Sequence, residues 1–471
     1  MRRIALALLT ALCLLPAAAA SASEEGAARY LASVRDDPVA LRAFLWDMPK
    51  GGDLHNHLSG AVYAESFVRW GAQAGVCLDA TYTARSGPCT EGQRPVADAL
   101  SDNVLYNNVL KAWSMKGFRE GLESGHDHFF ATFDRFSAAG SGRTGDMLAE
   151  VASRAASQNE QYLETLITPR FGDTMRVLNS VEWTDDLAVM RQRLLDAGLR
   201  GVVPLIQADT DAWFARQREV LGCATATPDP ACDLPVRLQF QGLRAQPLPF
   251  VFTQMVLAFE LMAVDSRWVA FNLVQPEDGP TALSNYARQM QFLQFLRPLY
   301  QGEHVTLHAG ELVRGIAPPA DLRFHIRDAV VVAGADRIGH GVDVTLERDA
   351  PGLLRRMARR KILVEAPLVS NCQILEVCGR EHPIGLYVRS GVPIALATDD
   401  EGVSRSDMTE QYEQAATVHG FGYRTLKRFA RDSLRYSFLS DGDKALALRK
   451  QREAFAAFEK RFPSPGDERL R

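Results

Sequence analysis

The sequence lacks the features that would direct it into a bilayer or onto a polyanion. Of its 471 residues 46% are hydrophobic and 23% are charged, and its one notable apolar run, residues 4–15, is too short to span a membrane. The formal charge of −4 gives no basic excess of the kind that nucleic-acid binding needs. We therefore expect a globular protein that binds no nucleic acid and, in its mature form, no membrane.

The first 22 residues predict a cleavable signal peptide. Arg2 and Arg3 precede the apolar run, and the small residues of PAAAASAS follow it. We expect cleavage after Ala22, with Ala20 as the neighbouring choice, which removes two positive charges and changes −4 to −6. A lipoprotein anchor on the one cysteine of this segment is disfavoured because leucine precedes it. The mature protein is thus expected in the periplasm or secreted.

The chain also lacks the CxxC spacing of a structural zinc site. Its seven cysteines leave six once the signal peptide is removed, an even number that suits an oxidising compartment. Two pairs lie in polar, turn-rich stretches and predict local disulfides, Cys77–Cys89 and Cys223–Cys232. Cys372 and Cys378 are close in sequence, but a free buried thiol is as consistent with their surroundings as a bond.

Eight β-rich runs alternate with helical patterns after residue 48. They read GGDLHNH, QYLETLI, VRLQFQGL, WVAFNLV, HVTLHAGE, RIGHGVDV, KILVEAPLV and PIALATDD. Strands that alternate with helices predict a parallel sheet, and eight such units predict a closed (β/α)8 TIM barrel of the α/β class. An open doubly wound sheet is the alternative, but no glycine-rich phosphate loop follows any strand.

The remaining segments frame this barrel. We expect a signal peptide over 1–22, a helical segment over 23–48, the barrel over 49–437 and a C-terminal helix and tail over 438–471. The cysteine pairs mark insertions near 76–100 and 220–235. The N-terminal helices could pair two subunits into a homodimer, or could equally pack on the barrel.

Histidines and acids gather at the predicted strand ends. His55 and His57 are two residues apart in a strand, so both side chains face one side. His308 and His340 end two later strands, and the chain has only 10 histidines. Asp399 and Asp400 end the last strand, and Glu311 follows His308. Since barrel active sites lie at the C-terminal strand ends, we expect these residues to converge.

Three imidazoles and a carboxylate predict a metal site. This set is a normal zinc coordination with one position left for water, although manganese, iron or cobalt could occupy it. Zinc lowers the pKa of bound water to about 7, which provides a nucleophile near neutral pH. The remaining carboxyl groups and histidine could then transfer protons or hold a substrate, so the chemistry indicated is hydrolysis.

The combination LHAGE, RIGHG and TDD, in this order after GGDLHNHLSG, resembles the adenosine deaminase family of metal-dependent barrel hydrolases. The likeness extends through VEAPLVSN and covers nearly all of the chain after residue 48. The signal peptide, the MPKG lead-in and the cysteine-bearing insertion are more similar to the secreted, growth-factor-type branch.

The resemblance implies one zinc ion per subunit, held by His55, His57, His308 and Asp399. It further implies that Glu311 protonates the purine ring at N1, that His340 steers the attacking hydroxide, and that Asp400 bonds the ring at N7. A proton donor beside a metal needs a pKa raised by burial. The implied reaction converts adenosine or 2′-deoxyadenosine to the inosine product and ammonia.

Three positions depart from the family pattern. Ser59 stands where an aspartate usually reaches the sugar's 5′ hydroxyl, and Gln275 stands where a glycine usually meets the ring at N3. Glu401 follows the paired aspartates, where proline is common. We expect these positions to bear on substrate recognition, with Ser59 and Gln275 as candidate substrate contacts.

Other polar residues carry weaker signals. Glu365 and Asn371 are as consistent with structural roles as with catalysis. His126 and His128 form a second HxH pair in a helical context, where such residues diverge, which favours surface or pocket-lining roles. His304 and His325 are expected to be ordinary surface or helix residues.

Two alternative functions stay open from the sequence. One is the same zinc hydrolase acting on a modified amino-purine nucleoside or another C–N bond, which the changes at Ser59 and Gln275 favour. The other is a secreted binding or signalling protein without catalysis. That alternative predicts damaged metal ligands or a missing proton donor, and both are intact in this sequence.

Overall fold

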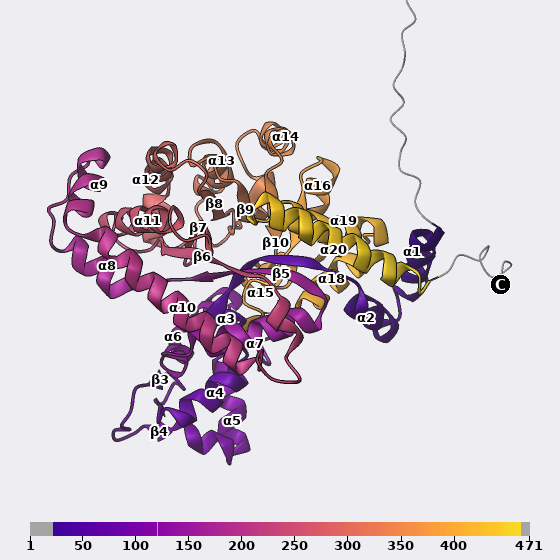
Figure 1. Cartoon of the computed structure of the whole chain (residues 1–471), viewed down its shortest axis with the longest axis horizontal. Helices are drawn as coiled ribbons and strands as arrows, with labels where there is room; N and C mark the ends of the chain where they lie inside the picture. Colours follow the sequence, from indigo (N-terminus) through magenta and orange to yellow (C-terminus); the bar gives the residue numbers. More distant parts are fainter. Residues whose placement is uncertain (1–21, 120, 463–471) are drawn as a thin grey trace, which may run out of the picture.

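The computed structural model describes residues 22–119 and 121–462. Within them, eight parallel strands form one sheet in the order β1-β5-β6-β7-β8-β9-β10-β11, surrounded by helices (Figure 1). The TIM barrel predicted from the alternating pattern is confirmed. Each strand lies within or overlaps one of the eight predicted runs: β1 (Gly51–His57), β5 (Glu160–Ile167), β6 (Val236–Leu243), β7 (Trp268–Val274), β8 (His304–Ala309), β9 (Arg337–His340), β10 (Leu363–Ala366) and β11 (Ile394–Leu396).

The barrel closes between its first and last strands, just beyond the end of β11. The amide of His57 donates to the carbonyl of Asp399 at 2.9 Å, and the amide of Asp399 donates to the carbonyl of His55 at 2.9 Å. Asn56 and Asp399 form the corresponding parallel bridge. The closing bonds therefore join the residues predicted to bind metal.

An outer ring of helices covers the strands, and each helix packs at least one of its faces against the rest of the protein. In α14, for example, Leu353, Leu354 and Met357 fall on one side of the helix and are buried, while arginines face out. The ring includes α7 (Thr144–Ser157), α10 (Val203–Val220), α11 (Leu248–Met262), α12 (Pro280–Leu296), α13 (His325–Val331), α14 (Ala350–Arg360), α16 (Ile384–Arg389), α18 (Met408–Thr417) and α19 (Tyr423–Arg435).

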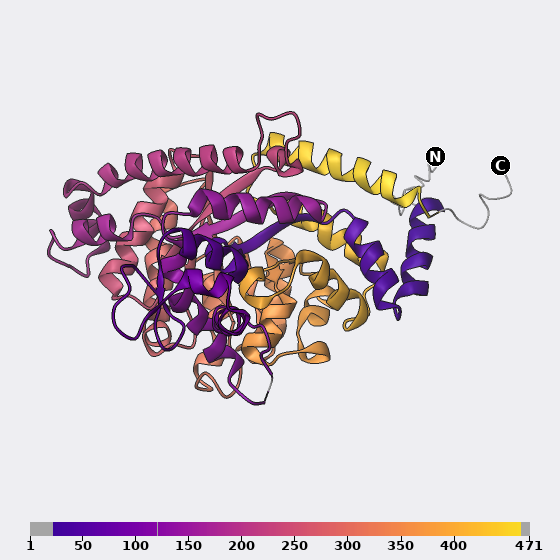
Figure 2. The ribbon, with the colours of Figure 1, turned by 90° about the horizontal axis from the view of Figure 1, so that it is seen from below.

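The two ends of the described chain pack together on one side of the barrel (Figures 1 and 2). The helices α1 (Ala22–Val34) and α2 (Pro38–Asp47) lie beside α20 (Asp441–Glu459). The ring centroids of Phe44 and Phe458 are 5.0 Å apart, and those of Tyr30 and Phe462 are 4.8 Å apart. The N-terminal helices thus use aromatic side chains against their own subunit.

The insertions carry the predicted disulfides. Cys77 and Cys89 are bonded in the first insertion, where β2 (Cys77–Leu78), β3 (Ala84–Arg85) and β4 (Arg94–Pro95) form a small sheet between α4 (Ala64–Gln73) and α5 (Asn103–Ala112). Cys223 and Cys232 are bonded in the second insertion. Cys372 and Cys378, whose state the sequence left open, are also bonded.

Among the described residues, no helix has the length and apolar character needed to cross a bilayer. The predicted signal peptide, with its cysteine, lies outside the described residues apart from Ala22, as does the end of the predicted C-terminal tail, 463–471.

Candidate active site

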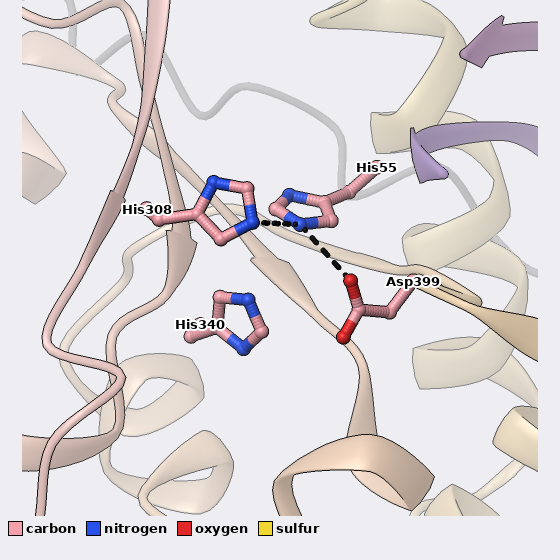
Figure 3. A group of neighbouring side chains, drawn as sticks. All are labelled: His55, His308, His340 and Asp399. Carbon is pink, nitrogen blue, oxygen red and sulfur yellow. Dashed lines mark hydrogen bonds and ion pairs between the residues drawn. The ribbon is translucent and has the colours of Figure 1, made fainter. Parts of the chain in front are cut away.

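The four predicted metal ligands meet at the C-terminal ends of β1, β8 and β11. The Nε2 atom of His308 is 3.0 Å from that of His55 and 3.1 Å from that of His57. Oδ1 of Asp399 lies 3.5 Å from His55 Nε2 and 3.3 Å from His57 Nε2. Figure 3 shows His55, His308 and Asp399 pointing toward one another, with His340 beside them.

These separations fit a single metal ion. Four ligands around zinc at Zn–N distances of 2.0–2.1 Å stand about 3.3–3.4 Å apart in a tetrahedral arrangement. Each imidazole also places its other nitrogen against an oxygen: Nδ1 contacts Glu365 in His55 (2.7 Å), Gln241 in His57 (2.9 Å) and Asn272 in His308 (2.9 Å). These contacts hold the Nδ1 protons and leave the three Nε2 lone pairs directed at the common point.

The protonation states of the ligands depend on this crowding. Burial and the neighbouring imidazoles lower the pKa of His308 well below its usual value. For His55 burial acts in the same direction, but hydrogen bonds to Asp399 and Glu365 outweigh it and raise its pKa to about 10. Without a metal His55 therefore holds a proton, which metal binding has to displace.

His340 is held by a short polar chain behind it. It ends β9 in the left-handed region, with φ +66°. Its Nδ1 donates to Asn371 Oδ1 at 2.7 Å, and Asn371 Nδ2 donates to His382 Nε2 at 2.9 Å. Burial, reinforced by His419 and His340, lowers the pKa of His382 to about 3, which keeps it neutral as an acceptor.

The contact with Asn371 fixes the tautomer of His340, because the side that meets a carbonyl oxygen must carry the proton. The other nitrogen, Nε2, is buried without a hydrogen-bond partner among the described residues. The ring centroids of His55 and His308 each lie 5.0 Å from that of His340. An unprotonated nitrogen therefore stands beside the ligand cluster, ready to accept a proton.

Glu311 is a buried acid anchored through its backbone. Burial, with the negative charges of Asp399 and Glu277, raises its pKa to about 8. Its amide and that of Gly310 donate to the carboxylate of Glu277, at 2.8 and 3.2 Å. At neutral pH Glu311 is thus mostly protonated and can give a proton away.

Glu277 and His325 are positions whose importance the sequence analysis missed. His325 begins helix α13, as expected, but its side chain is fully buried, so the predicted surface role is wrong. Its Nδ1 lies 2.6 Å from Glu277, and its ring stacks on Tyr286. Burial would raise the pKa of Glu277, but His325 and Arg244 hold it below its usual value. The fixed charge of Glu277 thus helps to keep Glu311 protonated.

The carboxyl group of Asp400 lies beside the metal-ligand cluster in space that is open because residue 60 is a glycine. Burial, opposed by His57 and reinforced by Asp399, raises its pKa well above the usual range, and its Oδ1 has no partner among the described residues. A Cβ on Gly60 would lie 1.6 Å from that oxygen. A Cβ on Gly339 would likewise come 2.5 Å from His55, so two glycines make room for the site.

A cavity of about 410 Å³ adjoins the cluster. Its wall combines His57, His308, Glu311, Asp399 and Asp400 with three phenylalanines of α6 (Gly125–Phe136). The other lining residues are Asp134, Gln241, Leu243, Val274, Gln275, Pro276 and Ile374. A wall that combines polar groups with aromatic rings suits a flat heterocycle.

The three departures from the family pattern lie in different places. Gln275 lines the cavity with φ +83°, in the backbone region that favours glycine, and its Oε1 accepts from the amide of Ala245 at 3.0 Å. Ser59 lines a neighbouring cavity. Glu401 is buried and turned toward Arg154, with Oε1 2.8 Å from its Nε, and does not line either of these cavities.

The weaker candidates also have defined positions. His126 contacts Asp278 at 3.0 Å, and this bond, with that to Asp127, outweighs burial and raises its pKa to about 9. His128 contacts Glu123 at 3.1 Å, and neither histidine is part of the ligand cluster. His304 is partly exposed and stacks on Phe438, as expected for a surface residue.

Comparison with known proteins agrees with this geometry. Residues 251–452 match the family model for adenosine deaminase. An adenosine deaminase from Salmonella heidelberg (strain SL476) is 35% identical over 158 residues, which are 33% of this chain and 44% of the relative; that from Salmonella typhimurium is 34% identical over 161 residues. The chain therefore matches less than half the length of these curated relatives.

Solved structures share the fold at low identity. An Arabidopsis N6-mAMP deaminase superposes with a TM-score of 0.57 at 18% identity, covering 87% of this chain and 99% of the other. An amidohydrolase from Burkholderia ambifaria with bound zinc gives 0.55 at 20% identity, covering 90% and 94%. The family-model match spans His308, Glu311, His340, Asp399 and Asp400. The resemblance to the adenosine deaminase family that the strand-end motifs indicated is thereby confirmed.

Proposed function

We propose that the protein is a zinc-dependent hydrolase of a C–N bond that removes the 6-amino group of a purine nucleoside, adenosine or 2′-deoxyadenosine. One observation carries the proposal: Nε2 of His308 (3.0 and 3.1 Å) and Oδ1 of Asp399 (3.5 and 3.3 Å) each lie close to Nε2 of His55 and of His57, beside Glu311, a buried acid whose pKa is about 8. Relatives named adenosine deaminase support the reaction, and a zinc-bound amidohydrolase of the same fold supports the metal.

The residues that would hold zinc are His55, His57, His308 and Asp399. Bound there, the ion would supply a Lewis acid that makes water nucleophilic near neutral pH. His340 accepts a proton from the attacking water at Nε2, since Asn371 keeps the proton of this ring on Nδ1. His340 acts as a base because burial, together with the charge of His55, lowers its pKa despite the opposing effect of Asp399.

Two carboxyl groups hold and activate the purine. Glu311 gives its proton to ring nitrogen N1, which makes the neighbouring carbon C6 more electrophilic. Burial raises the pKa of Asp400, which favours the protonated carboxyl, and this form can donate a hydrogen bond to N7, which is an acceptor. Phe129, Phe130 and Phe133 add apolar surface to the wall of the same cavity. Water and the nucleoside are consumed, and ammonia and the 6-oxo nucleoside are released.

The ultraviolet spectrum tests the reaction directly. The mature protein, residues 23–471, is stripped with a chelator, reloaded with zinc and mixed with adenosine, 2′-deoxyadenosine and a panel of modified amino-purine nucleosides. We expect conversion of adenosine that the chelator abolishes, that zinc restores, and that Glu311→Gln lacks. A zinc-loaded protein that changes no panel member would refute the proposal.

A second candidate substrate is an amino-purine nucleoside with a modified sugar or another C–N bond cleaved by the same centre. Ser59 and Gln275 favour it, because both stand at positions where the family contacts the nucleoside. An inert adenosine beside a reactive modified nucleoside in the same panel would select this candidate.

We further propose that the protein acts in the periplasm or outside the cell. The three disulfides support this location, because such bonds persist in oxidising compartments. Mass spectrometry of the exported protein should find an N-terminus at residue 23 and three intact disulfides. A cytoplasmic, full-length and reduced protein would contradict it.

A further inference from the structure

A groove between the helices α19 and α20 concentrates positive charge. The two helices pack against each other (Figure 1), and the groove has a volume of about 600 Å³. Among the described residues, its charged lining consists of six cations and two acids: Arg424, Lys427, Arg428, Arg431, Arg435, Arg452, Glu24 and Glu459. The groove thus has four positive charges in excess, although the chain as a whole has a formal charge of −4.

One end of the groove has its cations paired with acids. Nε of Arg424 and Nζ of Lys427 lie 3.3 and 2.7 Å from the carboxylate of Glu24. Nζ of Lys427 also lies 2.5 Å from the carboxylate of Glu459. Both acids of the lining are therefore at this end, where they offset the charges of Arg424 and Lys427.

The excess charge belongs to the other four cations, which form an arginine cluster: Arg428, Arg431, Arg435 and Arg452. Within residues 22–119 and 121–462, Arg428 and Arg452 form no ion pair and no side-chain hydrogen bond. Arg431 lies 3.6 Å from the carboxylate of Asp432, its neighbour in the chain. Most hydrogen-bond donors of the cluster are therefore available to an anion from solution.

The arginine cluster combines one face of α19 with a side chain of α20. Its three members in α19 follow one another at intervals of three and four residues, and all three are exposed. The side-chain amide of Gln451 donates to the carbonyl of Ala430 at 2.7 Å, which places the next residue, Arg452, beside them. Like charges at such intervals repel and destabilise a helix, so an anion bound across them would stabilise it.

The charge and the chemistry of the cluster suit phosphate. A guanidinium group can donate two parallel hydrogen bonds to a phosphate, which is why arginine is common in phosphate sites. A phosphate monoester carries a charge of about −1.5 to −2 near neutral pH. Two such groups on one ligand would therefore balance the four arginines, whereas a single phosphate or a carboxylate would balance half of their charge or less.

We propose that the arginine cluster is a binding site for an anion with two or more phosphate groups, whether a free polyphosphate compound or the headgroup of a phosphorylated lipid. The site is distinct from the catalytic cavity, with which the groove shares no lining residue. The proposal therefore does not depend on the proposed reaction, and binding tests it without turnover.

Calorimetry on the zinc-loaded mature chain tests the site with pyrophosphate, orthophosphate and sulfate. Low ionic strength is used, because salt screens exposed charges. We expect one pyrophosphate per chain at the cluster, bound about tenfold or more tightly than orthophosphate or sulfate, since its two phosphate groups contact more arginines. Equal affinity for the three anions, or no binding of pyrophosphate, would overturn the proposal.

Two substitutions assign the binding to the cluster. Arg428→Gln combined with Arg452→Gln should weaken pyrophosphate binding about a hundredfold, since the loss of each charged hydrogen bond costs roughly tenfold in affinity. This double variant should unfold at the wild-type temperature or above it, because a like-charge repulsion is removed. Arg449→Gln is the matched control, since Arg449 is an exposed arginine of α20 that does not line the groove.

The control should bind pyrophosphate as the wild type does. Heat from pyrophosphate at the zinc site would persist in every variant, so the difference between the double variant and the control isolates the groove. A double variant that binds pyrophosphate as tightly as the control would overturn the proposal.

Vesicles distinguish the two sources of phosphate. The mature chain is sedimented with phosphatidylcholine vesicles that contain or lack cardiolipin, a lipid whose headgroup has two phosphates. Binding that requires cardiolipin, is lost in the double variant and is competed by pyrophosphate would assign the site to a lipid headgroup. A protein that binds pyrophosphate through the cluster but sediments with neither vesicle would assign it to a free polyphosphate compound.

Discussion

The centre of the barrel and its catalytic end use the same kinds of residue in opposite ways. In the centre, Arg337 donates to Glu365 at 2.5 Å and to Glu164 at 2.5 Å, and Gln239 donates to Glu164 at 2.8 Å. At the catalytic end, His340 Nε2 and Asp400 Oδ1 are buried without a partner within the described part of the chain. In the centre the charged groups are paired with one another, whereas at the catalytic end these two polar atoms are free to bind a substrate.

Backbone strain follows the same division. Gln275, His340 and Asp399 all have φ between +59° and +83°, and each lies at or just beyond the end of a strand, on the catalytic side. Such conformations cost of order 1–3 kcal/mol each and persist where the surrounding structure enforces them. The paired charges in the middle of the barrel stabilise the fold, whereas the strained backbone at the catalytic end lowers stability. Substitutions in the middle should therefore mainly reduce stability, and substitutions at the catalytic end should mainly reduce activity.

The largest effect is expected from Glu311→Gln at the catalytic end. Loss of the proton donor should lower kcat about 10²–10⁴-fold. The stability of the protein should not fall. Folding raises the pKa of Glu311 from 4.5 to about 8, so this residue lowers the free energy of unfolding as pH rises through that window. Glutamine does not ionise and therefore avoids this loss. Steady-state kinetics and thermal unfolding at pH 7.5 measure the two quantities. A fall in both kcat and thermal stability would show that Glu311 has a structural role.

Arg337→Met should give the opposite signature. It leaves Glu164 and Glu365 buried without their cation, which costs about 3–5 kcal/mol of unfolding free energy. Urea denaturation measures the loss. Arg200→Met is the control, because the Arg200 side chain is 62% exposed in its pair with Glu260 and should contribute no more than about 1 kcal/mol. Equal losses in the two variants would show that the buried ion pairs of Arg337 contribute no more to stability than an exposed pair.

Gly60→Ala should reduce activity more than stability. The added Cβ would stand 1.6 Å from Asp400 Oδ1, so this carboxyl has to leave its position beside the metal-ligand cluster. We expect kcat/KM to fall about a hundredfold, as for other misplaced substrate-orienting groups. Gly172→Ala offers a matched control, because within the described residues nothing lies within 4 Å of its Cβ. Unchanged kinetics in Gly60→Ala would remove Asp400 from the site.

The smallest effect concerns pH. Glu311 must carry its proton to act, so activity is full below its pKa of about 8 and is lost as pH rises through it. The kcat should fall about tenfold for each unit above that point. Glu277→Gln removes one of the charges that raise this pKa and should move the alkaline limb to lower pH. A rate that stays constant to pH 9.5 would contradict this assignment.

Much of the fold could be predicted because its signals are local. The eight runs of β-rich sequence correspond to the eight strands, and His55 and His57 could be placed on one face because strand side chains alternate. Their convergence with His308 and Asp399 followed from one rule, that parallel strands in a barrel end at the same face.

The residues behind the site could not be predicted, because their contacts cross between elements. Glu277 comes just after β7, where the same strand-end rule could have drawn attention to it, but its partners His325 and Glu311 come from other segments. Burial of His325 depends on Tyr286 stacking from α12. The bond between Cys372 and Cys378 was likewise undecidable, since a spacing of six residues does not fix how close two sulfurs come.

The hydrogen bonds that close the barrel also set the order in which the protein can mature. His55 and Asp399 are separated by more than three hundred residues, yet their backbones are joined and their side chains share one point. A growing chain therefore cannot complete the metal-binding set until its last strand has been made. Pairing over so long a span is expected to be a late and slow event in folding. For a protein expected to cross a membrane unfolded, metal would be acquired at the destination, and the pool of ions there would determine which metal it holds.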